Sequence, residues 1–141
     1  MGIDLTYLQA YLASHRQLVR FCLVGFCNTA LCLAVIDGLK YFGHVNDVAS
    51  NMVGYAAGLT LSFTLNSIWT FNYRGPQLRA VARFLAVFAV AYVANLATVM
   101  CLIRVLGVNG YIAQMAGMPV YTVLFYILSR TYAFAEVPPP A

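Results

Sequence analysis

The chain has 141 residues, of which 62% are hydrophobic and only 9% are charged, and its formal net charge is +4. This small number of charged side chains cannot cover a water-soluble globule with polar surface. The composition therefore excludes an ordinary soluble domain. The mean hydropathy of +0.79 indicates that most of the chain lies in lipid.

The N-terminal residues 3–17 are predicted to form a short amphipathic helix in the headgroup region of a membrane. Apolar side chains from Ile3 to Leu12 recur at helical spacing, with polar side chains between them. We expect no cleaved signal peptide, because the first long apolar stretch begins only after Arg20.

Four segments are apolar for long enough to cross a hydrocarbon core of about 30 Å, which takes roughly 20 helical residues. They lie near residues 21–42, 48–71, 84–106 and 111–134. Lipid offers the backbone no hydrogen bonds, and the segments show no alternation of period two, so we predict helices rather than strands of a barrel. The predicted fold is a single all-α integral membrane domain over residues 1–141, with four transmembrane helices.

The basic residues predict the orientation, because short cytoplasmic loops retain Lys and Arg. Most of them precede the first segment, flank the central loop or end the fourth segment, and only Lys40 and Arg104 fall on the other side. Both termini and the central loop are therefore predicted to be cytoplasmic. Anionic headgroups explain the positive net charge, so we expect no nucleic-acid partner.

The chain matches itself without gaps at an offset of about 63 residues, which indicates an internal repeat. The repeats would be two helical hairpins, residues 20–74 and 83–137, and both would begin on the cytoplasmic side, as parallel repeats do. The most specific matches pair Arg20 with Arg83, Asn46 with Asn109, Gly54 with Gly117, and Phe71 with Phe134.

The repeat equates two polar and aromatic segments, NSIWTF at residues 66–71 and SRTYAF at residues 129–134. Each would form the cytoplasmic end of the second helix of its hairpin. Trp69 and Tyr132 could be interfacial anchors, because indole and phenol rings prefer the headgroup boundary. The alternative is that Trp69 belongs to a substrate site.

A stripe of small and polar residues precedes Trp69 at spacings of three or four, on one face of the predicted second helix. The stripe consists of Asn51, Gly54, Gly58, Ser62 and Asn66. It predicts either a close-packed helix seam or a polar groove along which a headgroup crosses the membrane. Asn28 in the first segment either bonds across helices or adds to that groove.

Charged residues near the two rims of the bilayer are candidate phosphate ligands. Asp37 and Lys40 are one turn apart and can pair, and Arg104 reaches the same rim from the third segment. The alternative for Lys40 and Arg104 is snorkelling to the headgroups. On the inner side Arg130 lies deepest in its helix, and a guanidinium suits phosphate because it donates two parallel hydrogen bonds.

Catalysis finds little support, and we predict that the protein is not an enzyme and has no cofactor and no metal. The two histidines, His15 and His44, would lie on opposite sides of the bilayer, so they cannot share a metal or serve a nucleophile. The sequence contains no phosphate-cradling glycine loop.

Three stretches resemble the GtrA-like family of four-helix membrane proteins: RFCLVGFCNT at residues 20–29, NMVGYAAGLTLSFTLNSIWTF at 51–71 and RFLAVF at 83–88. The resemblance covers nearly all of residues 20–134. The Asn-x-x-Trp-Thr-Phe ending is its most specific part. The family's fourth helix often carries an asparagine where this chain has Ser129.

The resemblance implies a role in cell-surface polysaccharide synthesis, in which a polyprenyl-phosphate-linked sugar is flipped across the bacterial inner membrane. The candidate substrate-binding residues are Asn28, Asp37, Lys40, Asn51, Asn66, Trp69, Arg104 and Arg130. Four helices of so short a chain enclose little volume between them. We therefore expect a homodimer. The alternative is a non-transporting scaffold that recruits a polyprenyl-phosphate glycosyltransferase. A proton-coupled exporter would need a membrane-buried carboxylate, for which Asp37 lies too near the rim.

Overall fold

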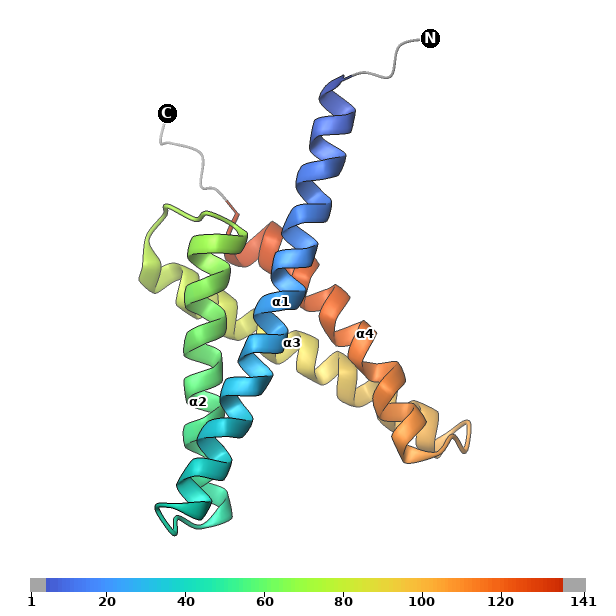
Figure 1. Ribbon diagram of the computed structural model, residues 1–141. Helices are drawn as coiled ribbons and strands as arrows, with labels where there is room; N and C mark the ends of the chain where they lie inside the picture. Colours follow the sequence, from blue (N-terminus) through green and yellow to red (C-terminus); the bar gives the residue numbers. More distant parts are fainter. Residues whose placement is uncertain (1–4, 136–141) are drawn as a thin grey trace. The chain divides into compact units, whose positions relative to one another are not determined.

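The structure is a computed structural model that describes the backbone of residues 5–135 and the side chains of residues 15–135. In this part of the chain all regular elements are helical and no strand occurs (Figure 1). Its elements are α1 (Leu5–Tyr41), α2 (Asp47–Leu65), the π-helical turn η1 (Asn66–Thr70), α3 (Gln77–Arg104), α4 (Gly110–Leu128) and the π-helical turn η2 (Ser129–Ala133). The all-helical prediction is confirmed.

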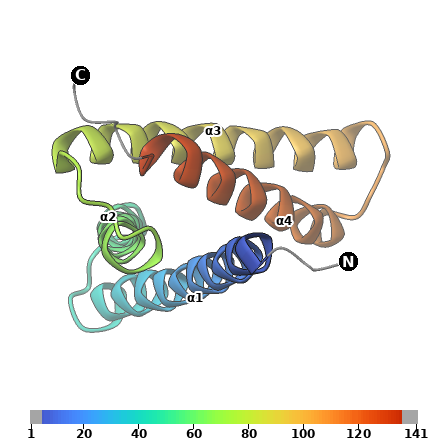
Figure 2. The same ribbon diagram turned by 90° about the horizontal axis from the view of Figure 1, so that it is seen from above.

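The chain divides into two compact units, Met1–Asn72 and Tyr73–Ala141, which we call unit 1 and unit 2. Each unit is a helical hairpin. In unit 1, α1 packs against α2 and η1, and in unit 2, α3 packs against α4 and η2 (Figures 1 and 2). A short loop joins the two helices of each hairpin, which makes them antiparallel.

Three described segments are long and apolar enough to cross a membrane: His15–Tyr41, Gln77–Arg104 and Gly110–Ala133. The predicted span at 48–71 coincides with α2 and η1, but it is less apolar than these three segments. Its buried face explains the difference, because it consists of small and polar residues such as Ser50, Gly54 and Ser62. Because α2 packs along α1, the two helices of this hairpin lie in the same environment.

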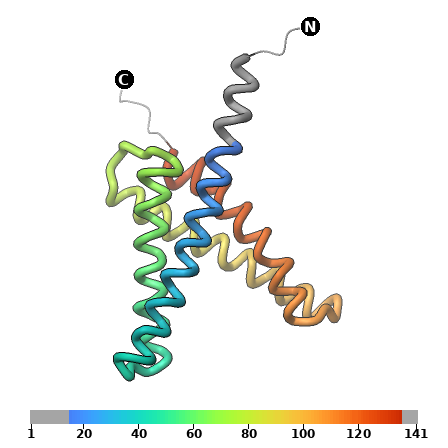
Figure 3. The backbone as a smooth tube through the Cα atoms, viewed as in Figure 1, coloured from blue at the N-terminus to red at the C-terminus, as the bar shows by residue number. Residues whose placement is uncertain are grey.

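The predicted amphipathic helix at 3–17 overlaps the start of α1, which is helical from Leu5 and runs without a break to Tyr41. The side chains of residues 1–14 lie outside the described part, so the predicted apolar face is not tested. Figure 3 traces the described backbone from α1 to η2.

The first helix of each hairpin ends with the same backbone hydrogen bond. The amide of Val45 donates to the carbonyl of Leu39 at 3.1 Å, and the amide of Val108 donates to that of Leu102 at 2.9 Å. The residue before each valine has a left-handed backbone, His44 with φ 50° and Gly107 with φ 64°. These are the two features of a Schellman helix end, at which glycine is the usual left-handed residue.

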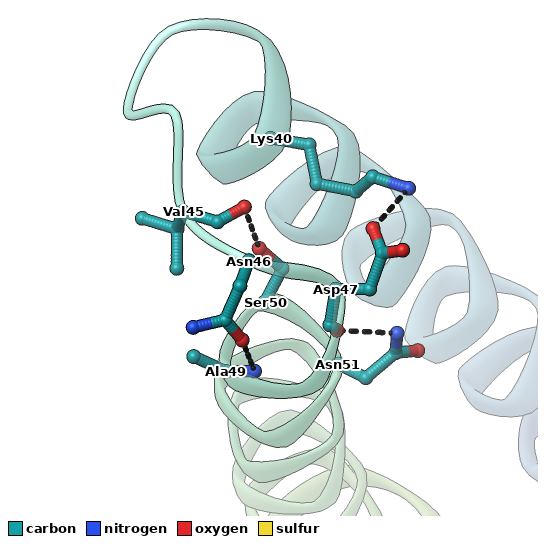
Figure 4. A network of polar contacts seen from close by, with 7 residues as sticks. All are labelled: Lys40, Val45, Asn46, Asp47, Ala49, Ser50 and Asn51. Carbon is teal, nitrogen blue, oxygen red and sulfur yellow. Dashed lines mark hydrogen bonds and ion pairs between the residues drawn. The ribbon is translucent and has the colours of Figure 1, made fainter.

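The second helix of each hairpin begins at a capping asparagine. Asn46 Oδ1 accepts a hydrogen bond from the amide of Ala49 at 2.9 Å (Figure 4). Asn109 Oδ1 accepts one from the amide of Tyr111, also at 2.9 Å. An asparagine cap satisfies a helix N–H group that has no partner within the helix.

The interiors of the two hairpins differ in kind. In unit 1, α2 contributes small buried residues, including two glycines. In unit 2 the aromatic rings of Phe84, Phe88, Tyr121 and Phe125 pack against one another, with centroids 5.2 to 6.4 Å apart for the contacting pairs. Many large apolar side chains, such as Phe26, remain exposed, as expected for helices that face lipid.

Candidate functional site

Both polar and aromatic segments that the sequence singled out form a π-helical turn. The amide of Phe71 donates to the carbonyl of Asn66 at 2.9 Å, and the amide of Phe134 donates to that of Ser129 at the same distance. Each bond joins residues that are five apart in the sequence, which defines a π turn, and such turns are frequent at functional sites. Hydropathy predicted helical ends here, but no local pattern in the sequence indicated the wider turn.

An arginine from the first helix of each hairpin contacts this π turn in the same way. Arg20 Nη1 donates to the carbonyl of Trp69 at 3.0 Å, and its guanidinium carbon lies 5.3 Å from the centre of the indole ring. Arg83 Nη1 donates to the carbonyl of Tyr132 at 3.5 Å and lies 5.2 Å from the phenol ring. Each bond uses one of the five N–H groups of a guanidinium. Sequence reasoning missed both pairs, although the offset of about 63 residues equates them.

The buried face of unit 1 differs by one residue from the predicted stripe. Ser50 is fully buried on α2, together with Gly54, Gly58 and Ser62, and Asn66 continues the same face into η1. The predicted member Asn51 lies beside this face, because one residue turns the chain by about 100°. Its Nδ2 instead donates to the carbonyl of Asp47 at 2.7 Å (Figure 4).

This face packs directly on α1. A Cβ atom at Gly54 would lie 2.5 Å from Cγ1 of Ile36 and 3.1 Å from the carbonyl oxygen of Cys32. A Cβ atom at Gly58 would lie 2.5 Å from Oδ1 of Asn28. The two glycines therefore bring the backbones together, and in unit 1 the packing alternative replaces the open groove.

Several buried polar atoms of unit 1 have no hydrogen-bond partner among the described residues. Asn66 is 1% exposed, and its Nδ2 donates to Ser62 Oγ at 3.2 Å, whereas its Oδ1 has no partner. Asn28 Oδ1 and Thr70 Oγ1 are in the same situation. A buried acceptor without a donor costs about 1–3 kcal/mol, so each such atom calls for an explanation.

The predicted pair of Asp37 and Lys40 is wrong as the main contact. Lys40 Nζ lies 2.8 Å from Oδ1 of Asp47, the first residue of α2 (Figure 4). Asp37 is exposed on α1. The hairpin loop brings Asp47 to the end of α1. The hydrogen bond and the charge of Lys40 lower the pKa of the Asp47 carboxyl below its usual range.

The remaining predicted residues lie at the ends of the hairpins. Trp69 is 44% exposed in η1, where only one turn separates it from Asn66. Arg104 is exposed in the last turn of α3, and Arg130 is exposed in η2 at the opposite end of unit 2. The structure thus places Asn28, Asn66 and Trp69 where α1 packs against α2 and η1. It leaves Asp37 and Asn51 outside this contact. No group of three or more His, Cys, Asp or Glu residues in the described part could hold a metal ion.

Antiparallel helical hairpins with long apolar spans, exposed apolar side chains and cations at their ends define a multi-pass membrane protein. A comparison with known families matches residues 20–134 to the family described as GtrA/DPMS, transmembrane domain. The chain belongs to this family, which confirms the resemblance noted in the sequence and associates the protein with glycosylation-related processes that use lipid-linked sugars. No curated protein matches the chain.

Proposed function

We propose that the protein translocates a polyprenyl-phosphate-linked monosaccharide across the bacterial inner membrane, for cell-surface polysaccharide or O-antigen modification. Membership of the family supports a lipid-linked sugar as the substrate. The observation that carries the proposal is the spacing of cations along the first helix of each hairpin. Arg20 and Lys40 in α1, like Arg83 and Arg104 in α3, are separated by about 30 Å at a rise of 1.5 Å per residue. This length matches the hydrocarbon core.

Cations at both rims can hold the phosphate before and after it crosses. Arg130 is the inner contact, because its fork donates two parallel hydrogen bonds to phosphate oxygens. Lys40 or Arg104 is the outer contact. The polyprenyl chain stays in lipid, so only the phosphate and the sugar need polar contacts, and passive exchange between the leaflets needs no energy source.

The amides of unit 1 would contact the sugar. Asn66 lies near the end of the hairpin and is 1% exposed, so the sugar reaches it only if α1 and η1 separate at this end. Asn28 lies deeper, opposite Gly58, so the sugar reaches it only if α1 and α2 separate. Asn51 has no part in this path, because it lies outside the buried face and bonds to Asp47.

We further propose that the two units arose by duplication and that both begin on the cytoplasmic side. The matching helix ends, caps, π turns and arginine contacts support the duplication, since all recur at an offset of about 63 residues. The distribution of basic residues supports cytoplasmic termini. A homodimer is proposed because each hairpin encloses little volume.

Reconstitution into liposomes tests the proposed translocation. A fluorescent polyprenyl-phosphate glucose is expected to exchange between leaflets faster with the protein than in protein-free vesicles. Arg130→Gln should slow the exchange by tenfold or more, because hydrogen bonds to a charged group contribute about 1.5–3 kcal/mol. Arg79→Gln is the matched control, since Arg79 is an exposed arginine in the first turn of α3. Exchange at the protein-free rate would reject translocation.

A scaffold that recruits a polyprenyl-phosphate glycosyltransferase is the second candidate. It is favoured by two half-exposed aromatic side chains, Trp69 and Tyr132, which are 44% and 51% exposed at the equivalent ends of the two hairpins. Aromatic side chains of this kind are enriched at protein interfaces. Copurification of a transferase that is lost in the Trp69→Ala and Tyr132→Ala double variant, together with protein-free exchange rates, would support this candidate.

A further inference from the structure

Three buried oxygen atoms without a partner occur in unit 1 near the contact between α1 and η1. They are Gln17 Oε1, Asn66 Oδ1 and Thr70 Oγ1. Asn66 and Thr70 are 1% and 2% exposed, so water at the surface of the protein does not satisfy them. Native proteins pair nearly all such atoms, so a cluster of them indicates a bound group that supplies hydrogen-bond donors.

Two contacts define this end of the hairpin. Arg20 donates to the carbonyl of Trp69, and the ring of Phe21 meets that of Phe71 edge to face, with centroids 6.2 Å apart. Gln17 lies one turn before Phe21 on the same face of α1.

The other two atoms come from η1 itself. Thr70 lies between Trp69 and Phe71 in the sequence, and Asn66 lies one turn before Thr70. All three unpaired oxygens are thus within about one helical turn of the contacts that join α1 to η1.

Unit 2 provides a built-in comparison. At the offset of about 63 residues, Gln17 corresponds to Ala80 and Thr70 corresponds to Ala133, and both alanines are 0% exposed. Unit 2 keeps the contact between Arg83 and Tyr132. The third position is polar in both units, because Ser129, which corresponds to Asn66, is 0% exposed and its Oγ also has no partner. The hairpin end therefore folds without polar side chains at the positions of Gln17 and Thr70, so packing does not require them in unit 1.

We propose that this end of unit 1 binds sugar hydroxyl groups, which donate hydrogen bonds to Gln17, Asn66 and Thr70. Amide oxygens accept hydrogen bonds, and the threonine hydroxyl can do so as well. An ionised phosphate and a polyprenyl chain have no donors, so neither can satisfy these atoms. This inference rests on the proposed function only for the identity of the lipid that carries the sugar. Within that function, the cluster binds the sugar and the rim cations bind the phosphate.

Tryptophan fluorescence can report binding at this position, because Trp69 is the only tryptophan in the chain and precedes Thr70. The protein in nanodiscs is titrated with polyprenyl-phosphate glucose and with the same polyprenyl phosphate without the sugar. We expect the glucose lipid to bind about tenfold more tightly, as two neutral hydrogen bonds allow. The double variant Gln17→Ala, Thr70→Ala keeps only the Asn66 acceptor, so it should lose most of this preference and bind the bare lipid as the parent does.

Two variants separate the proposed role from a general disturbance of the hairpin. Thr64→Ala changes an exposed threonine of α2 whose hydroxyl already donates to Thr60, so it should keep the preference. Thr70→Val keeps the shape and removes the hydroxyl, and should weaken the preference about threefold. This variant provides the test if the double variant does not fold.

Equal binding of the two lipids by the parent protein would overturn the sugar site, as would a double variant that keeps the preference. If the oxygens bind only water, the alanines will raise the unfolding temperature without changing lipid selectivity, which also overturns it. The proposed function fails separately. A protein that shows the sugar preference and its loss in the variant, but exchanges no lipid in liposomes, would retain the site and reject translocation.

Discussion

The clearest test of the hairpin packing is the substitution of Gly54 by alanine. The added Cβ atom would lie 2.5 Å from Ile36 Cγ1 and 3.1 Å from the carbonyl oxygen of Cys32, whereas carbon atoms pack at about 3.5–4.0 Å. The backbone carbonyl cannot rotate away, so α1 and α2 must separate. Overpacking of this kind costs about 1–3 kcal/mol, and the better helix propensity of alanine offsets about 1 kcal/mol. We expect a net loss of about 1 kcal/mol.

Gly25 and Gly38 of α1 are matched controls, because an added Cβ atom at either position meets nothing within 4 Å. Alanine there should stabilise the hairpin by up to about 1 kcal/mol through helix propensity alone. Equilibrium unfolding in mixed micelles with increasing sodium dodecyl sulfate, followed by circular dichroism, measures the free energy of unfolding. It should fall in Gly54→Ala and rise in Gly25→Ala and Gly38→Ala. The packing argument is refuted if Gly54→Ala is as stable as the parent, or if Gly25→Ala loses as much as Gly54→Ala.

Three further predictions concern the ends of the hairpins. His44→Gly should stabilise the protein by about 1 kcal/mol, because a left-handed backbone is costly for histidine; an unchanged thermal midpoint would contradict this. The lowered pKa of Asp47 stabilises the fold above the unfolded carboxyl value of about 3.9, and this contribution disappears as the pH falls through the lower folded value. Asp47→Asn should therefore lose less stability than the parent below about pH 4, and equal losses in thermal scans would contradict the pairing. Arg20→Gln should shift Trp69 emission because it removes a cation from the indole face, whereas Arg83→Gln, whose partner is Tyr132, should leave the emission unchanged.

The sequence predicted the helices well, because hydropathy is a local signal. The gaps between the predicted spans, at 43–47 and 107–110, fall at the observed turns, where Asn46 and Asn109 cap the following helices. The start of the third helix was less accurate. Hydropathy placed it at 84, whereas α3 begins at Gln77, because the two arginines in its first turns are charged and do not register as part of an apolar span.

The site was harder to predict, because it depends on which residues face each other across a hairpin. Lys40 has a carboxylate on its own helix and another just beyond the loop, and sequence distance favoured Asp37 over the observed partner Asp47. The stripe was assigned to Asn51 because of its amide, whereas close packing selects the smaller Ser50. Helical periodicity gives the direction of a side chain but not the residue it meets.

The contrast between the two interiors indicates which hairpin would open if a sugar passes between helices. In unit 2, rings such as Tyr121 and Phe125 lie 5.3 Å apart, and separating α3 from α4 would expose this aromatic surface. In unit 1 the glycine contacts bury little apolar area. Each closed hairpin holds a buried asparagine oxygen without a partner, Asn28 Oδ1 in unit 1 and Asn95 Oδ1 in unit 2, so opening would give either oxygen access to donors, and the difference between the hairpins lies in the aromatic packing. Backbone amides of α2 should therefore exchange hydrogen for deuterium faster than those of α4, and the reverse order would exclude unit 1 as the opening half.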